Sequence, residues 1–501
     1  MLIEGILSVL NMQTLLLITG GTLLGIIIGA IPGLTVTMGV ALFLPVTFAM
    51  SPVDGLSLLM GLYIGGTSGG LISAILLKIP GTPASIATTF DGHPMASRGE
   101  AGKALSVSII CSFLGGIFSL GVLFFVAPRL AEVALQFGPY EYFAIALFSL
   151  TLVAGLSGGS LARGLGAAAI GLIIAFVGMA PITAFPRFTF GWAELDGGIA
   201  LLPALIGLFA VSQLLEEAES RDSSTPPAAA NYNLRQMGFS VRAGFRHFGN
   251  WLRSSVIGTA IGILPGLGGS VCNLLAYGAA KKYSKHPEQF GTGITDGLVA
   301  SESSNNASTG GALVPLMTLG IPGDNTAAIL LAGFMIHGIT PGPMLFETQG
   351  LLVYGIFTAL VIANLVMVIG LFAFMRGFVR LLSVPKHILL PLIMMLCVIG
   401  AYGINNRLFD VGCMLVFGLI GWLMKKASIP MTPLLLGFIL GPIIEVNLRR
   451  GLMSSQGDVL PFITEPISGF VLLGTFIVVV VTAYKEFAKS RSGLPRSVAD
   501  N

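Results

Sequence analysis

The sequence predicts an all-α, polytopic integral membrane protein of about 12 to 15 helical segments, some of them broken or re-entrant, arranged as two inverted structural repeats. Three observations support this fold class: the composition, the recurrence of long apolar stretches, and the repetition of one interrupted unit in both halves. Hydrophobic residues make up 54% of the 501 residues and charged residues only 10%, whereas a soluble domain has about 25% charged residues. Lipid rather than water is therefore the main solvent of this fold.

The apolar stretches predict the type of secondary structure. They recur from Leu15 to Val481, and each covers roughly 17 to 25 residues, enough for a helix to cross about 30 Å of hydrocarbon. The alternation over about ten residues that is typical of a transmembrane β-barrel is missing, so spanning helices remain. The 67 glycines and 27 prolines favour closely packed and broken helices.

Charges and cysteines narrow the function classes. The net charge of +3 is spread thinly over many loops, which indicates no nucleic-acid partner. The four cysteines lie in apolar runs without metal-like or disulfide-like spacing, so they are expected to be small buried side chains. The first apolar run lacks a basic n-region and an Ala-x-Ala site, and it is interpreted as a retained anchor.

One unit occurs in both halves of the chain. Residues 25–34 read GIIIGAIPGL and residues 258–267 read GTAIGILPGL, with glycines, proline and leucine in register. Thr-Ser-Gly-Gly (67–70) precedes Ile-Pro-Gly (79–81), and Ser-Thr-Gly-Gly (308–311) precedes Ile-Pro-Gly (321–323). The same motifs in the same order indicate an internal duplication.

Loop charges predict that the two units run in opposite directions. Lys and Arg favour cytoplasmic loops, and in three pairs of corresponding loops only one member is basic. The basic members carry, in turn, Arg235, Arg242, Arg246 and Arg253; Lys281, Lys282 and Lys285; and Arg98 and Lys103. The N-terminus is therefore predicted to be periplasmic and the C-terminus cytoplasmic.

The duplication divides the chain into four predicted parts. These are the first inverted repeat (1–215), a cytoplasmic linker (216–250), the second inverted repeat (251–466), and an extra C-terminal helix with a cytoplasmic tail (467–501). In transporters with this plan, one unit moves against the other and exposes a midplane site alternately to each side.

Four Pro-Gly pairs at matched positions are the first candidate binding residues. Proline removes a backbone donor and glycine permits non-helical angles, so each pair can end one helix and start another inside the membrane. The N–H groups at helix starts suit an anion, and free carbonyls suit a cation. A kink filled by neighbouring helices is the alternative. The pairs are Pro32 and Gly33, Pro80 and Gly81, Pro265 and Gly266, and Pro322 and Gly323.

Small polar residues around these breaks are the second set of candidates. Their oxygens suit Na⁺ and the hydroxyls or carboxylates of an organic acid, although interhelical hydrogen bonding is the alternative for about half of them. They are Thr35, Thr67, Ser68, Thr82, Ser303, Asn305, Asn306, Asp324 and Asn325. Thr67, Ser68, Asn305 and Asn306 lie in the densest polar clusters and are the candidate Na⁺ ligands. No catalytic residue is expected.

Charged residues within apolar segments are expensive and indicate function. Lys78, close before Pro80, is a candidate partner for a substrate carboxylate, or it snorkels to the inner interface. Glu302 is a candidate ligand of a coupling ion. Asp324 and Asp296 are expected to cap the helices that follow them.

Four segments carry a resemblance to a known family. They are PGLTVTMGVALFLPVTF (32–48), KIPGTPASIATTFDGHPMA (78–96), DGLVASESSNNASTGGALVPLMTLGIPGD (296–324) and HGITPGPMLF (337–346). With them the chain resembles, over nearly its whole length, the large membrane subunit of the tripartite tricarboxylate transporters, the TctA family. The family's glycine-proline and Asn-Asn motifs map onto Pro32, Gly33, Pro80, Gly81, Asn305, Asn306, Pro322 and Gly323.

The resemblance implies a permease of the bacterial inner membrane. Its expected partners are a small four-helix membrane subunit, a periplasmic solute-binding protein and a small carboxylate such as citrate. It also implies coupling to a cation gradient, either Na⁺ or H⁺, and no other cofactor.

The leading hypothesis is therefore a secondary active importer of a tricarboxylate or dicarboxylate that works by alternating access at the repeat interface. A passive channel or a transporter of another small solute is the alternative, although no ring of like residues is readable. A membrane-embedded enzyme would need a nucleophile with a base, or a metal cluster, and the five histidines lie apart. The chain also lacks the P-loop lysine motif of an ATP-driven pump.

Overall fold

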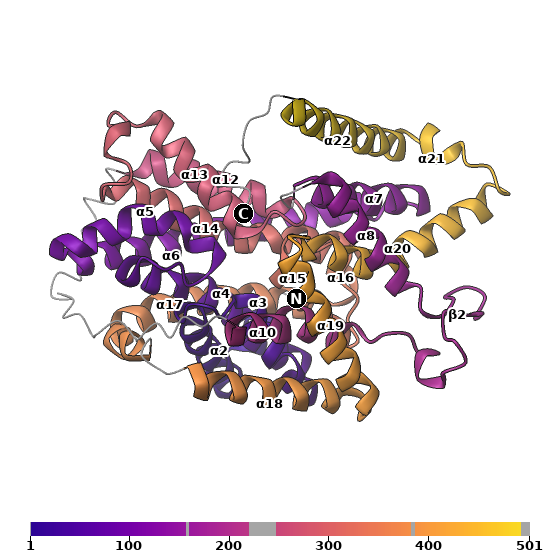
Figure 1. Ribbon diagram of the computed structural model, residues 1–501, viewed down its shortest axis with the longest axis horizontal. Helices are drawn as coiled ribbons and strands as arrows, with labels where there is room; N and C mark the ends of the chain where they lie inside the picture. The colour runs from indigo at the N-terminus through magenta and orange to yellow at the C-terminus, as the bar shows by residue number, and fades with distance from the viewer. Residues whose placement is uncertain (1, 157–159, 220–246, 382–385, 492–501) are drawn as a thin grey trace. The chain divides into compact units, whose positions relative to one another are not determined.

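The computed structural model describes residues 2–156, 160–219, 247–381 and 386–491 (Figure 1). Nearly all regular structure is helical, and the strands within these ranges are β1 (Gly178–Met179) and β2 (Pro186–Arg187), which pair antiparallel. The all-α prediction is confirmed. Most of the predicted linker lies outside the described residues, as do its three arginines at 235, 242 and 246 and the tail beyond residue 491.

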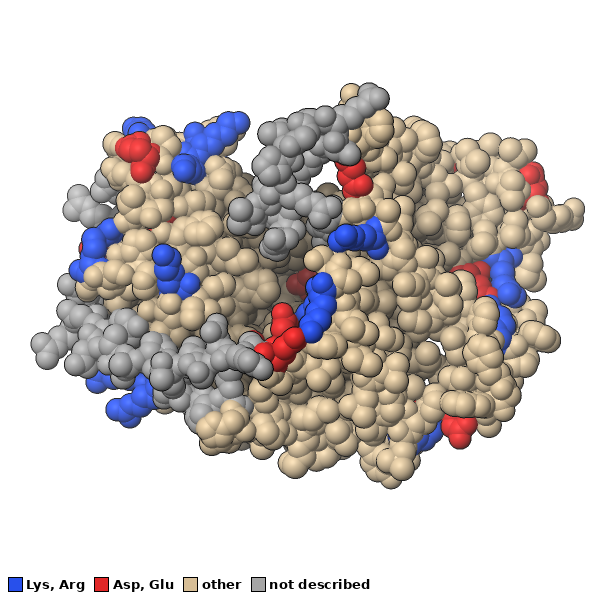
Figure 2. All heavy atoms as spheres, viewed as in Figure 1, with Lys and Arg blue, Asp and Glu red and all other residues tan. Residues whose placement is uncertain are grey.

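Nine helices within the described ranges are long and apolar enough to cross a membrane, so the chain is a multi-pass membrane protein. They lie in Met12–Ala30, Pro52–Leu77, Pro83–Ala134, Pro139–Leu156, Leu201–Glu219, Gly350–Arg380, Leu408–Lys426, Met431–Ser454 and Pro466–Phe487. Shorter apolar helices occupy Val36–Ala49, Leu161–Ala175, Asn325–Ile336 and His387–Gly403. In Figure 2 most of the described visible surface belongs to residues other than Lys, Arg, Asp and Glu, and the charged side chains form separate small groups.

The chain folds into two compact units, and each takes segments from both halves of the sequence. Unit 1 comprises Met1–Ala131 and Gln213–Ile404, and unit 2 comprises Glu132–Ser212 and Asn405–Asn501.

Unit 1 holds all or most of the following helices. They are α1 (Leu2–Val9), α2 (Met12–Ala30), α3 (Val36–Phe43), η1 (Pro45–Ala49), α4 (Pro52–Leu77), η2 (Pro83–Ser85), α5 (Ile86–Met95), η3 (Ala96–Glu100), α6 (Ala101–Ala134), α10 (Ser212–Glu219), α12 (Phe248–Ile263), α13 (Gly268–Tyr283), η7 (Pro287–Gln289), α14 (Thr295–Leu319), α15 (Asn325–Ile336), α16 (Met344–Thr348), α17 (Gly350–Leu381) and α18 (Lys386–Asn405).

Glycines allow two helix pairs of unit 1 to pack backbone against backbone. α2 packs on α4, and α12 packs on α14. A Cβ atom on Gly25 would lie 2.5 Å from the carbonyl oxygen of Leu62, and one on Gly262 would lie 2.5 Å from that of Ser308. Both distances are far shorter than van der Waals contact, so the glycines of the repeated motif are required by this close approach.

α4 and α14 form the buried centre of unit 1. Every residue of α4 from Asp54 to Leu76 and of α14 from Gly297 to Thr318 is buried. α14 is not among the nine apolar spans because its middle, residues 301–311, reads SESSNNASTGG. It packs against α4, α5, α12, α13 and α15, so its polar middle contacts protein. A polar helix at the centre of a membrane protein indicates a functional site.

Unit 2 contains the remaining helices and the small hairpin. Its helices are α7 (Pro139–Leu156), α8 (Leu161–Ala175), η4 (Ala193–Leu195), α9 (Leu201–Leu205), η5 (Ile206–Val211), α19 (Leu408–Lys426), α20 (Met431–Ser454), α21 (Pro461–Thr464) and α22 (Pro466–Arg491). α20 packs on α7 and α8, α22 on α7, and α19 on η5. Arg187 of β2 binds Glu445 of α20 through two hydrogen bonds of 2.7 and 3.1 Å, which fixes the hairpin to this unit.

Candidate functional site

Each of the four Pro-Gly pairs lies between two helices of unit 1. α2 ends before the first pair and α3 begins after it, and the other three pairs separate α4 from η2 and α5, α12 from α13, and α14 from α15. Gly33 and Gly266 have φ angles of +93° and +76°, a backbone conformation that suits glycine. The pairs thus interrupt the helices as expected, and each interruption is followed by a new helix start.

The two breaks of each half lie together. In the second half, the N–H of Gly266 donates to the carbonyl oxygen of Gly323 at 2.8 Å. In the first half, Gly81 packs so closely on the carbonyl of Gly29 that a Cβ would overlap that oxygen. The breaks therefore meet where the packed helices of each half end.

The helix starts that follow the breaks meet across the two halves. The hydroxyls of Thr37 on α3 and Thr326 on α15 are hydrogen-bonded at 2.9 Å. Asn273 on α13 donates from Nδ2 to the carbonyl of Ala84 at 2.7 Å, and its Oδ1 accepts from the N–H of Ala87 at 3.0 Å. Four helix N-termini thus lie in two pairs, and their dipoles favour an anion. Side chains of the protein already bond three of their N–H groups, those of Met38, Ala87 and Ala327.

The four residues from the densest polar clusters lie together at the crossing of α4 and α14. Asn305 donates from Nδ2 to the carbonyl of Thr67 at 3.2 Å. Ser68 donates from Oγ to Oδ1 of Asn306 at 2.7 Å. Thr67 is 6% exposed and the other three side chains are completely buried. The hydrogen bonds join the two halves, in agreement with the interhelical alternative for part of this set.

Some buried side-chain oxygens of the candidate residues have no hydrogen-bond partner within the described part of the chain. They include Oγ1 of Thr82, Oδ1 of Asn305 and Oδ1 of Asn325. A Cβ on Gly269, in the first turn of α13, would lie 3.1 Å from the Asn305 oxygen. Because an unpartnered buried acceptor is costly, these oxygens are the atoms best placed to bind a ligand.

The fit of a sodium ion to the four candidate ligands is partial. Ser68 donates from Oγ to Oδ1 of Asn306, the Nδ2 atom of Asn306 is directed at the carbonyl of Glu302, and the carbonyl of Thr67 already accepts from Asn305. The Oδ1 atom of Asn305 is the remaining side-chain acceptor of the four without a partner. Within the described residues, no three His, Cys, Asp or Glu side chains form a group able to hold a metal ion.

Asp324 caps a helix, as expected, and has an unexpected partner. Its Oδ1 accepts from the N–H of Ala327 at 2.6 Å at the start of α15. Its Oδ2 accepts from the hydroxyl of Tyr63 on α4 at 2.8 Å. Tyr63 was not among the residues predicted from the sequence. The available signal was that it is the one tyrosine in a glycine-rich helix.

Asp296 does not cap α14, and that expectation is wrong. The helix starts after Ile294, and no side chain caps it. The Oδ1 atom of Asp296 is instead hydrogen-bonded to Nδ1 of His247 at 2.8 Å and to Nδ2 of Asn250 at 3.0 Å. The carboxylate thereby ties the start of α12 to the start of α14.

Three candidates lie apart from the crossing. Lys78 is exposed and ends α4 in a left-handed conformation with φ of 60°, where α14 has Gly320 with φ of 71°. The backbone of Ser303 packs on Gly115 of α6. Thr35 caps α3 by accepting from the N–H of Met38 at 3.1 Å.

Glu302 is the charged residue closest in sequence to the crossing, three residues before Asn305. It is completely buried. Its Oε1 accepts from Thr88 of α5 at 2.5 Å and its Oε2 accepts from Ser112 of α6 at 2.8 Å. The sequence indicated Glu302 as a charged residue in an apolar environment. It did not indicate that Thr88 and Ser112 are its hydrogen-bond partners.

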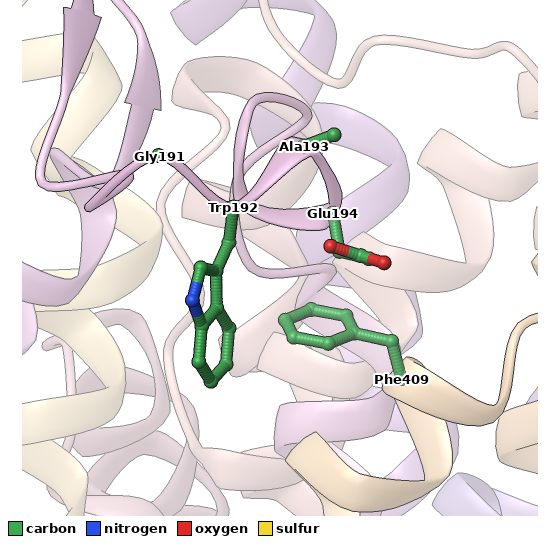
Figure 3. Close-up of a pocket in the computed structure, with 5 residues that line it drawn as sticks. All are labelled: Gly191, Trp192, Ala193, Glu194 and Phe409. Carbon is green, nitrogen blue, oxygen red and sulfur yellow. The ribbon is translucent and has the colours of Figure 1, made fainter.

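Unit 2 has a shallow surface pocket of a different kind. Trp192 and Glu194 line it together with Phe409, as the labelled side chains in Figure 3 show. None of the candidate residues lies there, so the site in unit 1 is the stronger candidate.

Comparisons with known proteins agree with the transporter resemblance. The family model described as tripartite tricarboxylate transporter TctA family matches residues 15–436. An Agrobacterium vitis protein described as an uncharacterized 52.8 kDa protein in the TAR-I ttuC' 3'region is 37% identical over 472 residues, covering 94% of this chain and 93% of that protein. A second A. vitis protein, described as an uncharacterized protein in the TAR-II ttuC' 3'region, is 38% identical over 234 residues, covering 47% of this chain and 96% of that protein. No solved structure matches the chain.

Proposed function

Because the chain belongs to the tripartite tricarboxylate transporter TctA family, we propose that it is the permease through which an organic carboxylate enters the cell by cation-coupled alternating access. The substrate is a tricarboxylate or dicarboxylate. The chain is a membrane component of such a transporter and not an enzyme.

The observation that carries the proposal is the convergence of four helix starts beside buried, unpartnered amide and hydroxyl oxygens. A helix start offers N–H groups to a carboxylate. Thr82 and Asn305 offer oxygens to a substrate hydroxyl or to a cation. Discontinuous helices that meet at the midplane are the usual binding architecture of secondary transporters.

Reciprocal contacts support two inverted repeats with the predicted bounds 1–215 and 251–466. Helix α3 meets α15. The first follows the first break of the first half, and the second follows the second break of the second half. The exchanged contact is also present, since α13 follows the first break of the second half and meets η2 and α5, which follow the second break of the first half. A two-fold relation between homologous units produces such exchanged contacts, and the loop charges orient the N-terminus to the periplasm.

The site would bind substrate without a described basic side chain at its centre. Lys78 is exposed, so in this proposal it meets a substrate carboxylate only on the way into or out of the site. The dipoles of the helix starts then stabilise the carboxylates in the bound state. A periplasmic solute-binding protein supplies the substrate, and a small four-helix membrane subunit completes the complex.

The test is uptake by proteoliposomes that contain the complete three-part system. Labelled citrate and labelled succinate are supplied outside, with and without the solute-binding protein, and with and without an inward H⁺ or Na⁺ gradient. Accumulation is expected only with both the binding protein and a cation gradient. Accumulation without either component would refute receptor-dependent symport, and mere equilibration in every condition would favour a passive channel.

A further inference from the structure

Glu302 has a hydrogen-bonding environment that accommodates both of its protonation states. Each carboxylate oxygen has its own hydroxyl donor, Thr88 on one side and Ser112 on the other. Thr88 also lies within hydrogen-bond distance of Ser301, with 3.2 Å between the hydroxyl oxygens. Because a hydroxyl both donates and accepts, Thr88 can accept from a protonated Glu302 and turn its own hydrogen to Ser301.

The ionised carboxylate has little compensation here. No Lys, Arg or His forms an ion pair with Glu302 among the described residues. Burial of an isolated carboxylate costs several kcal/mol, and two neutral hydroxyls offset only part of that cost. The conformation of the structure therefore stabilises the neutral acid, and the anion requires access to water.

Three other carboxylates on the surrounding helices have partners of their own. Asp91 of α5 accepts from the Tyr277 hydroxyl and from three backbone N–H groups, those of residues 291, 293 and 294. Asp324 is bonded to Tyr63, and Asp296 to His247. The titratable or charged groups on the helices packed around Glu302 are Asp54, Tyr63, Lys78, Asp91, His93, Lys103, Cys111, Arg129, Glu132, Arg253, Cys272, Tyr277, Lys281, Lys282, Tyr283, Asp296 and Asp324, with His247 and His337 at helix ends.

The position of Glu302 links it to the candidate site. It precedes Asn306 by four residues on α14, about 6 Å along the axis, and the Asn306 amide lies 3.5 Å from its backbone carbonyl oxygen. Thr88 belongs to α5, whose first turn is bonded to Asn273 near the helix starts. A movement of α5 against α14 would break the Thr88–Glu302 hydrogen bond. The same movement would displace the first turn of α5, which lies at the candidate binding site.

We propose that Glu302 is the residue that carries the coupling proton, with Thr88 and Ser112 as its hydrogen-bond partners. The inference rests on the proposed function and adds the identity and location of the coupling ion. The buried acid holds the proton while the site is closed. When α5 or α6 withdraws and water enters, the O–H bond of the carboxyl group breaks, the proton passes to water, and the carboxylate remains until it is protonated from the other side.

A proton fits this cluster better than a metal cation. Hard cations take about six or more oxygen ligands. Here the Thr88 hydroxyl oxygen lies 2.5 Å from Oε1 of Glu302, and the Ser112 hydroxyl oxygen lies 2.8 Å from Oε2. Such distances are typical of direct hydrogen bonds to a carboxylate. The Thr88 and Ser112 hydroxyls contact the carboxylate oxygens directly, so these oxygens are already bonded without a metal ion between them.

The experiment compares Glu302→Gln with wild type in proteoliposomes of the complete three-part system, using the carboxylate that wild type transports. The glutamine is close in shape and stays neutral. Accumulation driven by a pH gradient is expected to be lost, while exchange of labelled for unlabelled carboxylate at equal concentrations is retained. Glu302→Asp, which keeps a titratable group, is expected to regain part of the accumulation.

The matched control is Glu141→Gln in unit 2. Glu141 is also buried, at 9% exposure, and caps the N–H of Gly138 at 2.8 Å, so normal accumulation is expected. Accumulation by Glu302→Gln at the wild-type level would overturn the inference, as would loss of exchange in a variant that is folded and inserted. Wild-type accumulation driven by Na⁺ but not by a pH gradient would overturn it as well. A wild-type complex that moves no carboxylate would instead refute the proposed function.

Discussion

Asn305→Ala separates binding from folding, because the two polar atoms of this amide have different surroundings. Nδ2 donates to the Thr67 carbonyl at 3.2 Å, whereas the buried Oδ1 has no partner within the described chain. Loss of the first bond costs about 0.5 to 1.5 kcal/mol, or about 0.6 kcal/mol by the average for membrane proteins. Removal of an unpartnered buried acceptor returns about 1 to 3 kcal/mol. On these figures the free energy of unfolding is expected to fall by no more than about 0.5 kcal/mol, and to rise by up to about 2.5 kcal/mol.

Transport by Asn305→Ala is expected to fall. The Oδ1 atom can only accept a hydrogen bond, so its partner on the bound substrate is a hydroxyl group, and such a bond contributes about 0.5 to 1.5 kcal/mol. At about 1.4 kcal/mol for each factor of ten, its loss lowers uptake about twofold to tenfold. The measurement is the initial uptake rate in proteoliposomes, set beside thermal unfolding of the purified protein.

Asn306→Ala is the comparison variant for the stability part of this prediction, since the Oδ1 atom of Asn306 already accepts from Ser68. It leaves a buried hydroxyl without a partner, so it is expected to cost more stability than Asn305→Ala. Wild-type uptake by Asn305→Ala would refute the binding role of the free oxygen. A loss of stability above about 2 kcal/mol in that variant would show that the oxygen has a structural partner.

Three further outcomes follow from the contacts and the loop charges. Asn306→Ala is expected to impair transport at normal membrane abundance. A double-mutant cycle with Ser68→Ala, measured by thermal unfolding, should give a coupling energy of about 0.6 kcal/mol. Additive effects of the two substitutions would mean that the Ser68–Asn306 hydrogen bond does not contribute to stability. Cysteines at Lys103 and at exposed Thr340, introduced separately, should react with an impermeant maleimide from opposite sides of the membrane, and reaction from the same side would contradict the inverted repeats. Lys78→Gly should raise the free energy of unfolding by about 1 kcal/mol, because its φ of 60° suits glycine, and loss of transport in this stable variant would show that the ammonium group contacts substrate.

Much of the fold was predictable because its determinants are local. Low charge and long apolar runs indicated membrane helices, and each Pro-Gly pair indicated a helix end, since the missing N–H and the freedom at positive φ act at the residue itself. The capping role of Asp324 was also predictable, because a cap bonds to the N–H three residues on. Asp296 was expected to cap α14 on the same grounds, but its carboxylate is hydrogen-bonded instead to His247, which precedes α12, and to Asn250 of α12.

The candidate site was predictable only in part. Density of polar residues identified Thr67, Ser68, Asn305 and Asn306, and these four do lie together. Density also selected Ser303, which faces α6 instead, because adjacent positions on a helix point in different directions. The role of Tyr63 was not predicted, because its hydrogen-bond partner Asp324 is 261 residues away in the chain.

By itself the sequence determined the membrane class, the duplicated unit and the places where its helices are interrupted, since each depends on composition or on the chemistry of neighbouring residues. The tertiary structure alone decided which helix starts meet, because Thr37 and Thr326 are 289 residues apart and only folding brings them into contact. It also decided that Glu302 is bonded by Thr88 and Ser112, and that the free oxygen at the crossing belongs to Asn305. Whether a buried polar group is satisfied depends on partners from distant segments, and no local pattern contains that information.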